Sequence, residues 1–249
     1  MDGKNMLIYG FQPIMEAMDS GREIEKILIL KTMHPSRSNE VKRKASGLKI
    51  PFQFVPLEKL NRLTRQNHQG LVAFTSAVTY APIEQIIPRL FESGKTPLIL
   101  ILDKVTDVRN LGSIARTAEC AGVDALLFPS QGSAMINADA VKTSAGALTK
   151  LDISRVSNLK ETIQFLKESG ITIVAASEKA SALFYEVDFT MPVAIIMGSE
   201  GTGVSDEYLK MCDKTASIAM VGEIRSLNVS VAAGIFLFEA VRQRQSAVE

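Results

Sequence analysis

The chain has 249 residues, 46% of them hydrophobic and 22% charged, with a net charge of +1, which is ordinary for a soluble globular protein of one large domain or two small ones. Its longest apolar runs, near residues 98–102 and 231–238, are far too short to span a bilayer. Because no apolar run follows the N-terminus and the two cysteines form no motif, we expect a cytoplasmic protein with free thiols.

The first third of the chain is basic. Residues 1–76 carry 12 Lys/Arg and 7 Asp/Glu, whereas residues 77–249 carry 16 and 20. A basic module joined to a slightly acidic body is typical of proteins that bind nucleic acid, although an ordinary solvated surface gives the same pattern.

Short strands and helices alternate in this third, which predicts a small α/β domain over residues 1–76. We expect strands at 26–30, 52–55 and 71–75 and helices at 13–19, 38–46 and 57–65. The candidates for nucleic-acid contact are the basic side chains of two of these segments: Lys42, Arg43, Lys44, Arg62 and Arg65. His68 has no partner at metal-ligand spacing, so it either shapes its loop or contacts RNA.

Residues 77–97 have a different composition. Proline and glycine punctuate the segment and leave room for only a short helix. This pattern predicts a linker between two domains.

From residue 98 the pattern is that of an α/β domain that extends to residue 249. Continuous apolar strands are typical of a parallel sheet covered on both faces. We expect strands at 98–102, 125–128, 153–156, 171–176 and 193–197, and helices at 111–121, 137–147, 159–168 and 204–211. A last helix starts after Asn228, which can cap it, and its apolar first half is expected to be buried all round.

Three polar loops follow strands of this second domain, at residues 103–110, 198–203 and 222–228. Ligands bind at the carboxyl ends of strands in such sheets. The second loop has the spacing G-x-x-G-x-G rather than G-x-G-x-x-G, so it does not indicate a dinucleotide site. Arg116 suits a phosphate, although it could be an ordinary surface arginine, just as the other polar residues could be caps and turns.

These loops carry the motifs of a known family. The segments DVRNLGSIARTA at 107–118, IMGSEGTG at 196–203, and IAM at 218–220 with SLNVS at 226–230 resemble the three signature motifs of SpoU-type RNA ribose 2′-O-methyltransferases, members of the trefoil-knotted SPOUT superfamily. Residues 1–76 resemble the small RNA-binding domain of bacterial large-subunit rRNA guanosine methylases. Val108 departs from the family, which usually has proline there.

The resemblance implies a fold and a reaction. The fold is a small α/β RNA-binding domain followed by a knotted α/β domain with a parallel sheet. The reaction is methylation of a ribose 2′-hydroxyl, here of a guanosine in 23S rRNA, with S-adenosyl-L-methionine as donor. The protein is expected to be a homodimer, joined through the apolar C-terminal helix of the knotted domain, with no metal and no membrane contact.

The same resemblance assigns residues. It implies cofactor binding by Gly198, Ile218, Met220 and Leu227, and a catalytic set of Asn110, Arg116, Glu200, Ser226 and Asn228. RNA contact is expected from Arg109 in addition to the basic residues and His68 of the first domain.

Two other functions stay open. The substrate could be tRNA, because the motifs are shared and only the first domain argues for rRNA. The chain could also be a non-catalytic rRNA-binding assembly factor, although its complete polar set argues against this. A nucleotide-dependent oxidoreductase is disfavoured by the glycine spacing.

Overall fold

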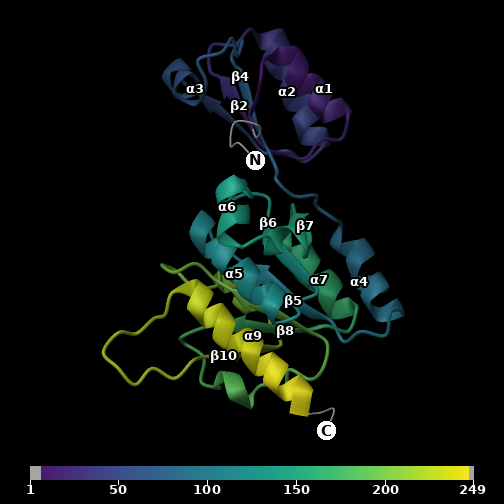
Figure 1. The fold of residues 1–249 in the computed structure, drawn as a ribbon, viewed down its shortest axis with the longest axis vertical. Helices are drawn as coiled ribbons and strands as arrows, with labels where there is room; N and C mark the ends of the chain where they lie inside the picture. The colour runs from purple at the N-terminus through teal and green to yellow at the C-terminus, as the bar shows by residue number, and fades with distance from the viewer. Residues whose placement is uncertain (1–6, 247–249) are drawn as a thin grey trace. The chain divides into compact units, whose positions relative to one another are not determined.

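The computed structural model describes residues 7–246, which form two compact units (Figure 1). The first unit ends at Thr79 and takes in the short segment Met135–Ala138. The second consists of Tyr80–Ala134 and the chain from Asp139 onward.

A four-stranded sheet forms the centre of the first unit. Strands β1 and β4 pair antiparallel, β4 and β2 also pair antiparallel, and β2 and β3 pair parallel. The order across the sheet is β1 (Leu7–Tyr9), β4 (Leu71–Thr75), β2 (Ile24–Leu30) and β3 (Phe52–Val55). The predicted strands are confirmed, whereas the three-residue β1 is too short to give a recognisable sequence pattern.

Helices cover both faces of this sheet, as Figure 1 shows. On one face, α1 (Phe11–Asp19) and α2 (Pro35–Gly47) bury a large apolar cluster against the sheet. On the other face, the shorter α3 (Leu57–Leu63) covers a smaller cluster around Leu60. The small α/β domain predicted from the sequence is therefore present.

The second unit is built on a six-stranded parallel sheet. Across the sheet the strands are β10 (Lys214–Ala216), β8 (Thr172–Ala176), β9 (Val193–Met197), β5 (Leu98–Leu102), β6 (Ala125–Pro129) and β7 (Asp152–Val156). Every residue of the central strands β5 and β9 is buried. This matches the parallel sheet, covered on both faces, that continuous apolar strands predict.

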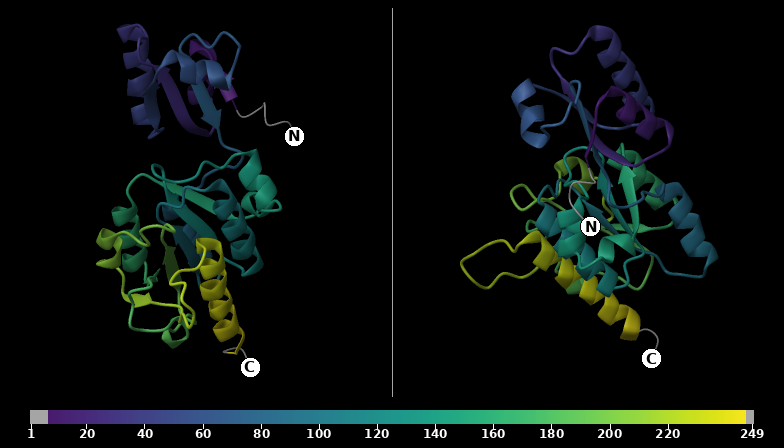
Figure 2. Two further views of the ribbon diagram at one scale, coloured as in Figure 1. Left: turned by 90° about the vertical axis from the view of Figure 1, so that its left-hand side faces the viewer. Right: turned by 45° about the horizontal axis from the view of Figure 1, so that its top comes forward.

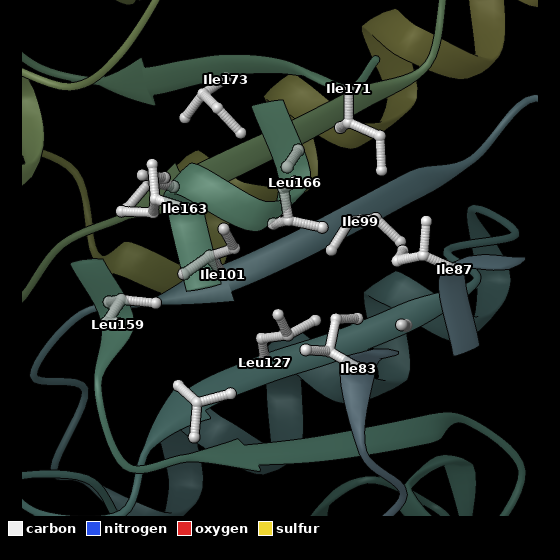
Figure 3. Packing of buried hydrophobic residues seen from close by; sticks show 14 of the residues in the cluster. Ile83, Ile87, Ile99, Ile101, Leu127, Leu159, Ile163, Leu166, Ile171 and Ile173 are labelled. Atoms are coloured by element: carbon white, nitrogen blue, oxygen red, sulfur yellow. The ribbon is translucent and has the colours of Figure 1, made fainter. Parts of the chain in front are cut away.

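Successive side chains of β5 point to opposite faces. Ile99 and Ile101 join a core cluster with α4 (Ile83–Glu92) and α7 (Leu159–Glu168). Figure 3 shows Ile83 and Ile87 of α4 in this cluster. The other face is covered by α5 (Val108–Cys120) and α9 (Val229–Ser246), which lie side by side (Figures 1 and 2).

The predicted linker at residues 77–97 needs a correction, because most of it is part of the second unit. Its helix α4 buries Ile83, Ile86, Ile87 and Leu90 against the sheet. These positions follow the i, i+3, i+4, i+7 pattern of an amphipathic helix. Because proline usually ends or kinks a helix, Pro88 made this pattern difficult to recognise in the sequence.

Two further helices are shorter than predicted. The segment expected to be helical at 137–147 contains α6 (Ala138–Thr143) and then a 3₁₀ turn at Ala147–Thr149. The helix expected at 204–211 is the single turn α8 (Asp206–Leu209). By contrast, α5 starts early, at Val108, a first helical position where proline and other residues are both tolerated.

The expectation that α9 is buried all round is wrong for the single chain. Val229, Ala233, Phe236 and Leu237 are buried, but Val231 and Phe238, seven residues apart on one side of the helix, are about half exposed, at 51% and 50%. Ahead of α9, residues 218–228 stand out from the second unit (Figures 1 and 2).

The end of α9 is held by one side chain. The Arg244 guanidinium donates hydrogen bonds to the carbonyls of Thr96 and Pro97 before β5 (2.8 and 3.1 Å) and of Phe189 and Met191 before β9 (2.9 and 3.1 Å). Burial lowers the pKa of Arg244 from its usual value, but an arginine stays charged in a protein. Arg244 therefore ties α9 to the amino ends of both central strands.

Both cysteines are free, as expected from the sequence. Cys120 is exposed, whereas burial, aided by the charge of Asp213, raises the pKa of Cys212 to about 12. Within the described part of the chain, every helix is either too short or too polar to cross a membrane.

We expect Arg244→Ala to lower the free energy of unfolding by about 2–4 kcal/mol, because it leaves several carbonyls without their charged donor. Arg244→Lys keeps the charge but not the planar fork, so the loss should be smaller. Urea unfolding measures both. Arg89→Ala is the control: it breaks the exposed Arg89–Asp152 pair, which should cost less than about 1 kcal/mol. Equal losses for Arg244→Ala and the control would contradict this account.

Candidate active site

The three polar loops predicted from the sequence start at neighbouring places on the second sheet. Strands β8, β9 and β5 are adjacent and parallel, so their carboxyl ends share one edge. The β5 loop leads into α5, and the β9 loop leads into α8. The third segment follows β10, at the end of the sheet beside β8, and leads into α9.

The loop after β9 is a tight turn that requires glycine at its first position. Ser199 and Gly203 exchange backbone hydrogen bonds of 3.2 and 2.9 Å, which closes the turn. A Cβ added to Gly198 would lie 2.0 Å from the Gly203 carbonyl carbon and 2.1 Å from the Val204 nitrogen. No side chain fits there, so Gly198 is fixed by backbone packing.

The buried carboxylate of Asp103 stabilises this turn. Asp103, 1% exposed, follows β5 directly, and its Oδ2 accepts a hydrogen bond of 2.7 Å from the Ser205 amide. Its own amide donates to the Met197 carbonyl (2.8 Å). No motif in the sequence assigned this role to Asp103, although it directly follows a fully apolar strand.

Three side chains, one from each loop, form a closed hydrogen-bonded set. Asn110 Nδ2 donates to Glu200 Oε1 (3.1 Å), and Asn228 Nδ2 donates both to Asn110 Oδ1 (3.1 Å) and to Glu200 Oε1. We call these residues the polar triad. The structure thus joins three residues of the predicted catalytic set that are up to 118 positions apart in sequence.

Each amide of the triad is also fixed by a helix start. Asn228 Oδ1 accepts from the Ser230 amide (2.9 Å) and the Ser230 hydroxyl (2.5 Å), so it caps α9 as predicted. Asn110 lies in the first turn of α5, which Asp107 caps. Hydrogen bonds from the amides of Asn110 and Arg109 lower the pKa of Asp107, so the cap stays ionised at neutral pH.

A cavity of about 320 Å³ opens beside this triad. Its lining includes all four residues predicted to bind the cofactor, Gly198, Ile218, Met220 and Leu227. Glu200 and Ser226 of the predicted catalytic set also line it. Other lining residues, which no sequence motif predicted, come from the end of β8, from the loop after it and from α9: Ala176, Ser177, Glu178, Lys179 and Phe236.

Arg116 stands apart from the triad. It is exposed on α5, and no side chain in the described residues is seen to pair with its guanidinium. Arg109 is exposed one heptad earlier, so both arginines lie on the same side of α5. The polar triad therefore does not hold Arg116 in place, and the Arg116 guanidinium is free to bind an anionic ligand.

The start of α5 is crowded. A Cβ at Gly112 would lie 2.6 Å from the Thr143 Cβ and 2.9 Å from the Ala140 carbonyl oxygen, so the helix start leaves no room for a ligand at this position. The glycine instead allows α6 to pack closely against α5.

The predicted RNA contacts of the first unit do not form one patch. Lys42, Arg43 and Lys44 lie on α2, on one side of the sheet, while Arg62 and Arg65 belong to or follow α3 on the other side. Lys44 is also engaged, since it pairs with Asp19 and donates to the Met15 carbonyl. Its role in the structure is to join α2 to α1.

His68 does not fit the predicted RNA contact. It is 9% exposed, its Nδ1 accepts from the Gly70 amide (3.0 Å), and its Nε2 lies 3.0 Å from Asn61 Oδ1. Because Nδ1 accepts, the proton is on Nε2 and is donated to Asn61. Both ring nitrogens therefore hold the loop before β4 onto α3, which is the loop-shaping role.

Metal chemistry has no ligand set in the part of the chain that the structure describes. No group of three His, Cys, Asp or Glu side chains there could hold an ion. The site's functional groups are amides, carboxylates and exposed arginines. Such a set can position a polar, negatively charged substrate beside the cavity.

Comparison with known proteins places both units in one family. Residues 97–238 match the model of the SpoU rRNA methylase family, and residues 7–81 match that of the RNA 2′-O ribose methyltransferase substrate-binding domain. A protein of Staphylococcus saprophyticus assigned by name to the TrmH family of tRNA/rRNA methyltransferases is 37% identical over 241 residues, or 97% of each chain.

Solved structures agree. An rRNA methyltransferase from Sinorhizobium meliloti with bound AdoMet is 26% identical, with a TM-score of 0.61 over 95% of this chain and 87% of that one. The TrmH/SpoU tRNA modifying enzyme of A. aeolicus is 35% identical, with a TM-score of 0.57 over 67% of this chain and 86% of that one. From the motif-bearing loops and these matches together, the chain belongs to the SpoU/TrmH family of RNA methyltransferases.

Proposed function

We propose that this protein methylates a ribose 2′-hydroxyl in RNA, and that its substrate is a guanosine of 23S rRNA. The observation that carries the proposal is the polar triad of Asn110, Glu200 and Asn228 beside a cavity lined by Gly198, Ile218 and Leu227. The cavity can hold a nucleoside-sized cofactor, and the polar triad beside it can bind a polar acceptor.

S-adenosyl-L-methionine is the expected cofactor, and the cavity fits it. The volume of the cavity, about 320 Å³, is within the range that small-molecule sites usually have. Ile218 and Leu227 offer apolar walls for a base, and the closely packed backbone at Gly198 offers peptide groups for hydrogen bonds. When bound, this cofactor supplies a methyl group already activated by its positively charged sulfur.

The protein's own task is then to align the hydroxyl and assist loss of its proton. Holding the reacting groups in line supplies as much as ~7–11 kcal/mol in favourable cases. We assign alignment to the triad and Ser226. Glu200 and Ser226 line the cavity, and Asn110 and Asn228 donate hydrogen bonds to Glu200. The hydroxyl oxygen would take the methyl group as the methyl–sulfur bond breaks with its electron pair left on sulfur, and the hydroxyl proton would pass to water or to a carboxylate of the site.

Arg116 is assigned to the substrate rather than to proton transfer. A guanidinium is always protonated in proteins, so it cannot act as the base. Its free, exposed cation can clamp a phosphate next to the target ribose and favour ionisation of the hydroxyl. Arg109, on the same side of α5, is placed to contact the RNA backbone nearby.

The share of the chain that each solved enzyme matches supports rRNA over tRNA as the substrate. The S. meliloti rRNA enzyme matches 95% of this chain, including the first unit, whereas the A. aeolicus tRNA enzyme matches 67%. Residues 7–81 match a substrate-binding domain. tRNA remains the second candidate, because other relatives are named for both substrates.

Three further properties belong to this proposal. The cavity-forming segments of the second unit form the trefoil knot of the SPOUT superfamily. Two chains associate through α9, which the exposed apolar side chains Val231 and Phe238 support. The protein acts in the cytoplasm.

The proposal is tested by labelled methyl transfer from S-adenosyl-L-methionine to unmodified 23S rRNA and, in parallel, to unmodified tRNA. Products are mapped for alkali-resistant linkages, which mark 2′-O-methylation. Label at one ribose of 23S rRNA is the expected result. Label in tRNA alone would move the substrate, and label in neither RNA despite cofactor binding would favour the non-catalytic assembly factor.

Arg116→Ala should lower kcat about 10²–10³-fold, the loss typical of one electrostatic group at a reacting centre. The Kd for S-adenosyl-L-methionine should not change, because Arg116 does not line the cavity. The control is Arg109→Ala, which should mainly raise the KM for RNA. Single-turnover kinetics and calorimetry measure these constants, and a large rise in cofactor Kd for Arg116→Ala would refute the assignment.

Gly198→Ala should weaken S-adenosyl-L-methionine binding at least about tenfold, because the new methyl group would collide with the backbone of Gly203 and Val204. Gly222→Ala is the control, since no atom lies within 4 Å of its added Cβ and Gly222 does not line the cavity. It should bind the cofactor almost as the wild type does. Isothermal calorimetry compares the three proteins, and equal affinities would contradict the role given to this turn.

A further inference from the structure

The α3 side of the first unit's sheet is only partly covered. Helix α3 has seven residues and is therefore roughly 10 Å long. Its Leu60 packs with Leu28 and Val72, which lie directly opposite each other, and with Val55 of β3, which lies opposite Leu30. Because side chains two apart on a strand share a face, the next row on the same side is two residues along each strand.

That next row is polar at its centre. It contains Phe74 of β4 directly opposite Lys26 of β2. Lys26 Nζ also donates a hydrogen bond of 2.8 Å to Oε1 of Gln53, the diagonal neighbour on β3 that lies opposite Leu28. Leu7 of β1 completes it beside Phe74. Gln53 is exposed, and Lys26 and Phe74 are half-buried. We call Lys26, Gln53 and Phe74 the open row.

Helix α3 brings more positive charge to the open row. Lys59 and Arg62 are exposed, one helical turn apart, and no acidic partner is seen for either within the described residues. Burial, together with the charge of Lys59, lowers the pKa of Lys26 from its usual value, so the two ammonium groups are close enough to repel each other. Glu58 is the acid that α3 itself carries.

The α1/α2 side of the sheet differs. Three of the four cations of α2 are engaged: Lys44 pairs with Asp19, Lys42 lies over the Phe54 ring and Arg37 over the Phe11 ring, whereas Arg43 is exposed. The two helices also cover that face with a continuous apolar cluster. Charge and exposure together therefore favour the α3 side as the surface for a polyanion.

We propose that the open row and the exposed cations of α3 form the RNA-binding surface of the first unit, with phosphates bound by Lys26, Lys59 and Arg62 and a nucleotide placed against Gln53 and Phe74. A phosphate bound between Lys26 and Lys59 relieves their repulsion. The half-buried Phe74 ring offers an edge or face to a base, and the Gln53 amide offers a donor and an acceptor. The proposal rests on the proposed function, since it names the surface that receives the RNA substrate.

The test compares two double variants of the full-length protein that each remove two positive charges. Lys59→Gln/Arg62→Gln changes the α3 side, and Arg37→Gln/Arg43→Gln changes α2. Filter binding to unmodified 23S rRNA transcript is measured over a series of KCl concentrations. We expect the α3 variant to bind at least about tenfold more weakly and to lose about 1.4–1.8 from the slope of log affinity against log salt, as two phosphate contacts require.

The α2 variant should keep its affinity within about twofold of that of the wild type, and its salt slope should not change. A third variant, Phe74→Leu, keeps an apolar side chain in the cluster and should weaken binding severalfold with the slope unchanged. Equal effects of the two double variants, or a larger effect of the α2 variant, would overturn the proposal while leaving the methyltransferase function intact. A wild-type protein that neither binds nor methylates 23S rRNA or tRNA would instead refute the proposed function itself.

Discussion

The site depends on one close backbone contact, between Gly198 and the Gly203–Val204 peptide. This contact folds the chain back on itself directly after β9, so the turn can present Glu200 outward while its backbone lines the cavity. Asp103 holds the far end of the turn through Ser205, so the turn is fixed on both sides. Since β5 and β9 are adjacent, the same support positions the start of α5 and thus Asn110.

Helix α9 connects the site to the opposite edge of the sheet. At its start, Asn228 belongs both to the polar triad and to the helix cap. At its end, Arg244 binds carbonyls at the opposite edge of the sheet, before β5 and β9. The two central strands and α9 are thus connected at both ends. The first half of the helix packs beside α5 and exposes Val231 and Phe238, so its apolar sequence serves two surfaces, one buried and one exposed.

The sequence predicted those features that a local pattern determines. The fully apolar strands β5 and β9 and the cap at Asn228 are examples, because one strand or one helix turn is enough to specify them. Long-range contacts could not be predicted in this way. Lys44 resembles any surface lysine until Asp19 is placed beside it, and His68 resembles a candidate ligand until Asn61 and Gly70 occupy its ring. Motif resemblance brought Asn110 and Glu200 together, whereas their spacing alone did not.

The side chain of Asn228 also shows how little chemical change the site allows. Its amide uses all its hydrogen-bonding capacity: Nδ2 donates twice, to Asn110 and Glu200, and Oδ1 accepts twice, from Ser230. Aspartate has the same shape but an acceptor in place of that donor. It would set a second carboxylate against Glu200, and two carboxylates in contact retain a proton between them. A single nitrogen atom therefore decides whether Glu200 is held by two amide donors or becomes one half of an acid pair that titrates.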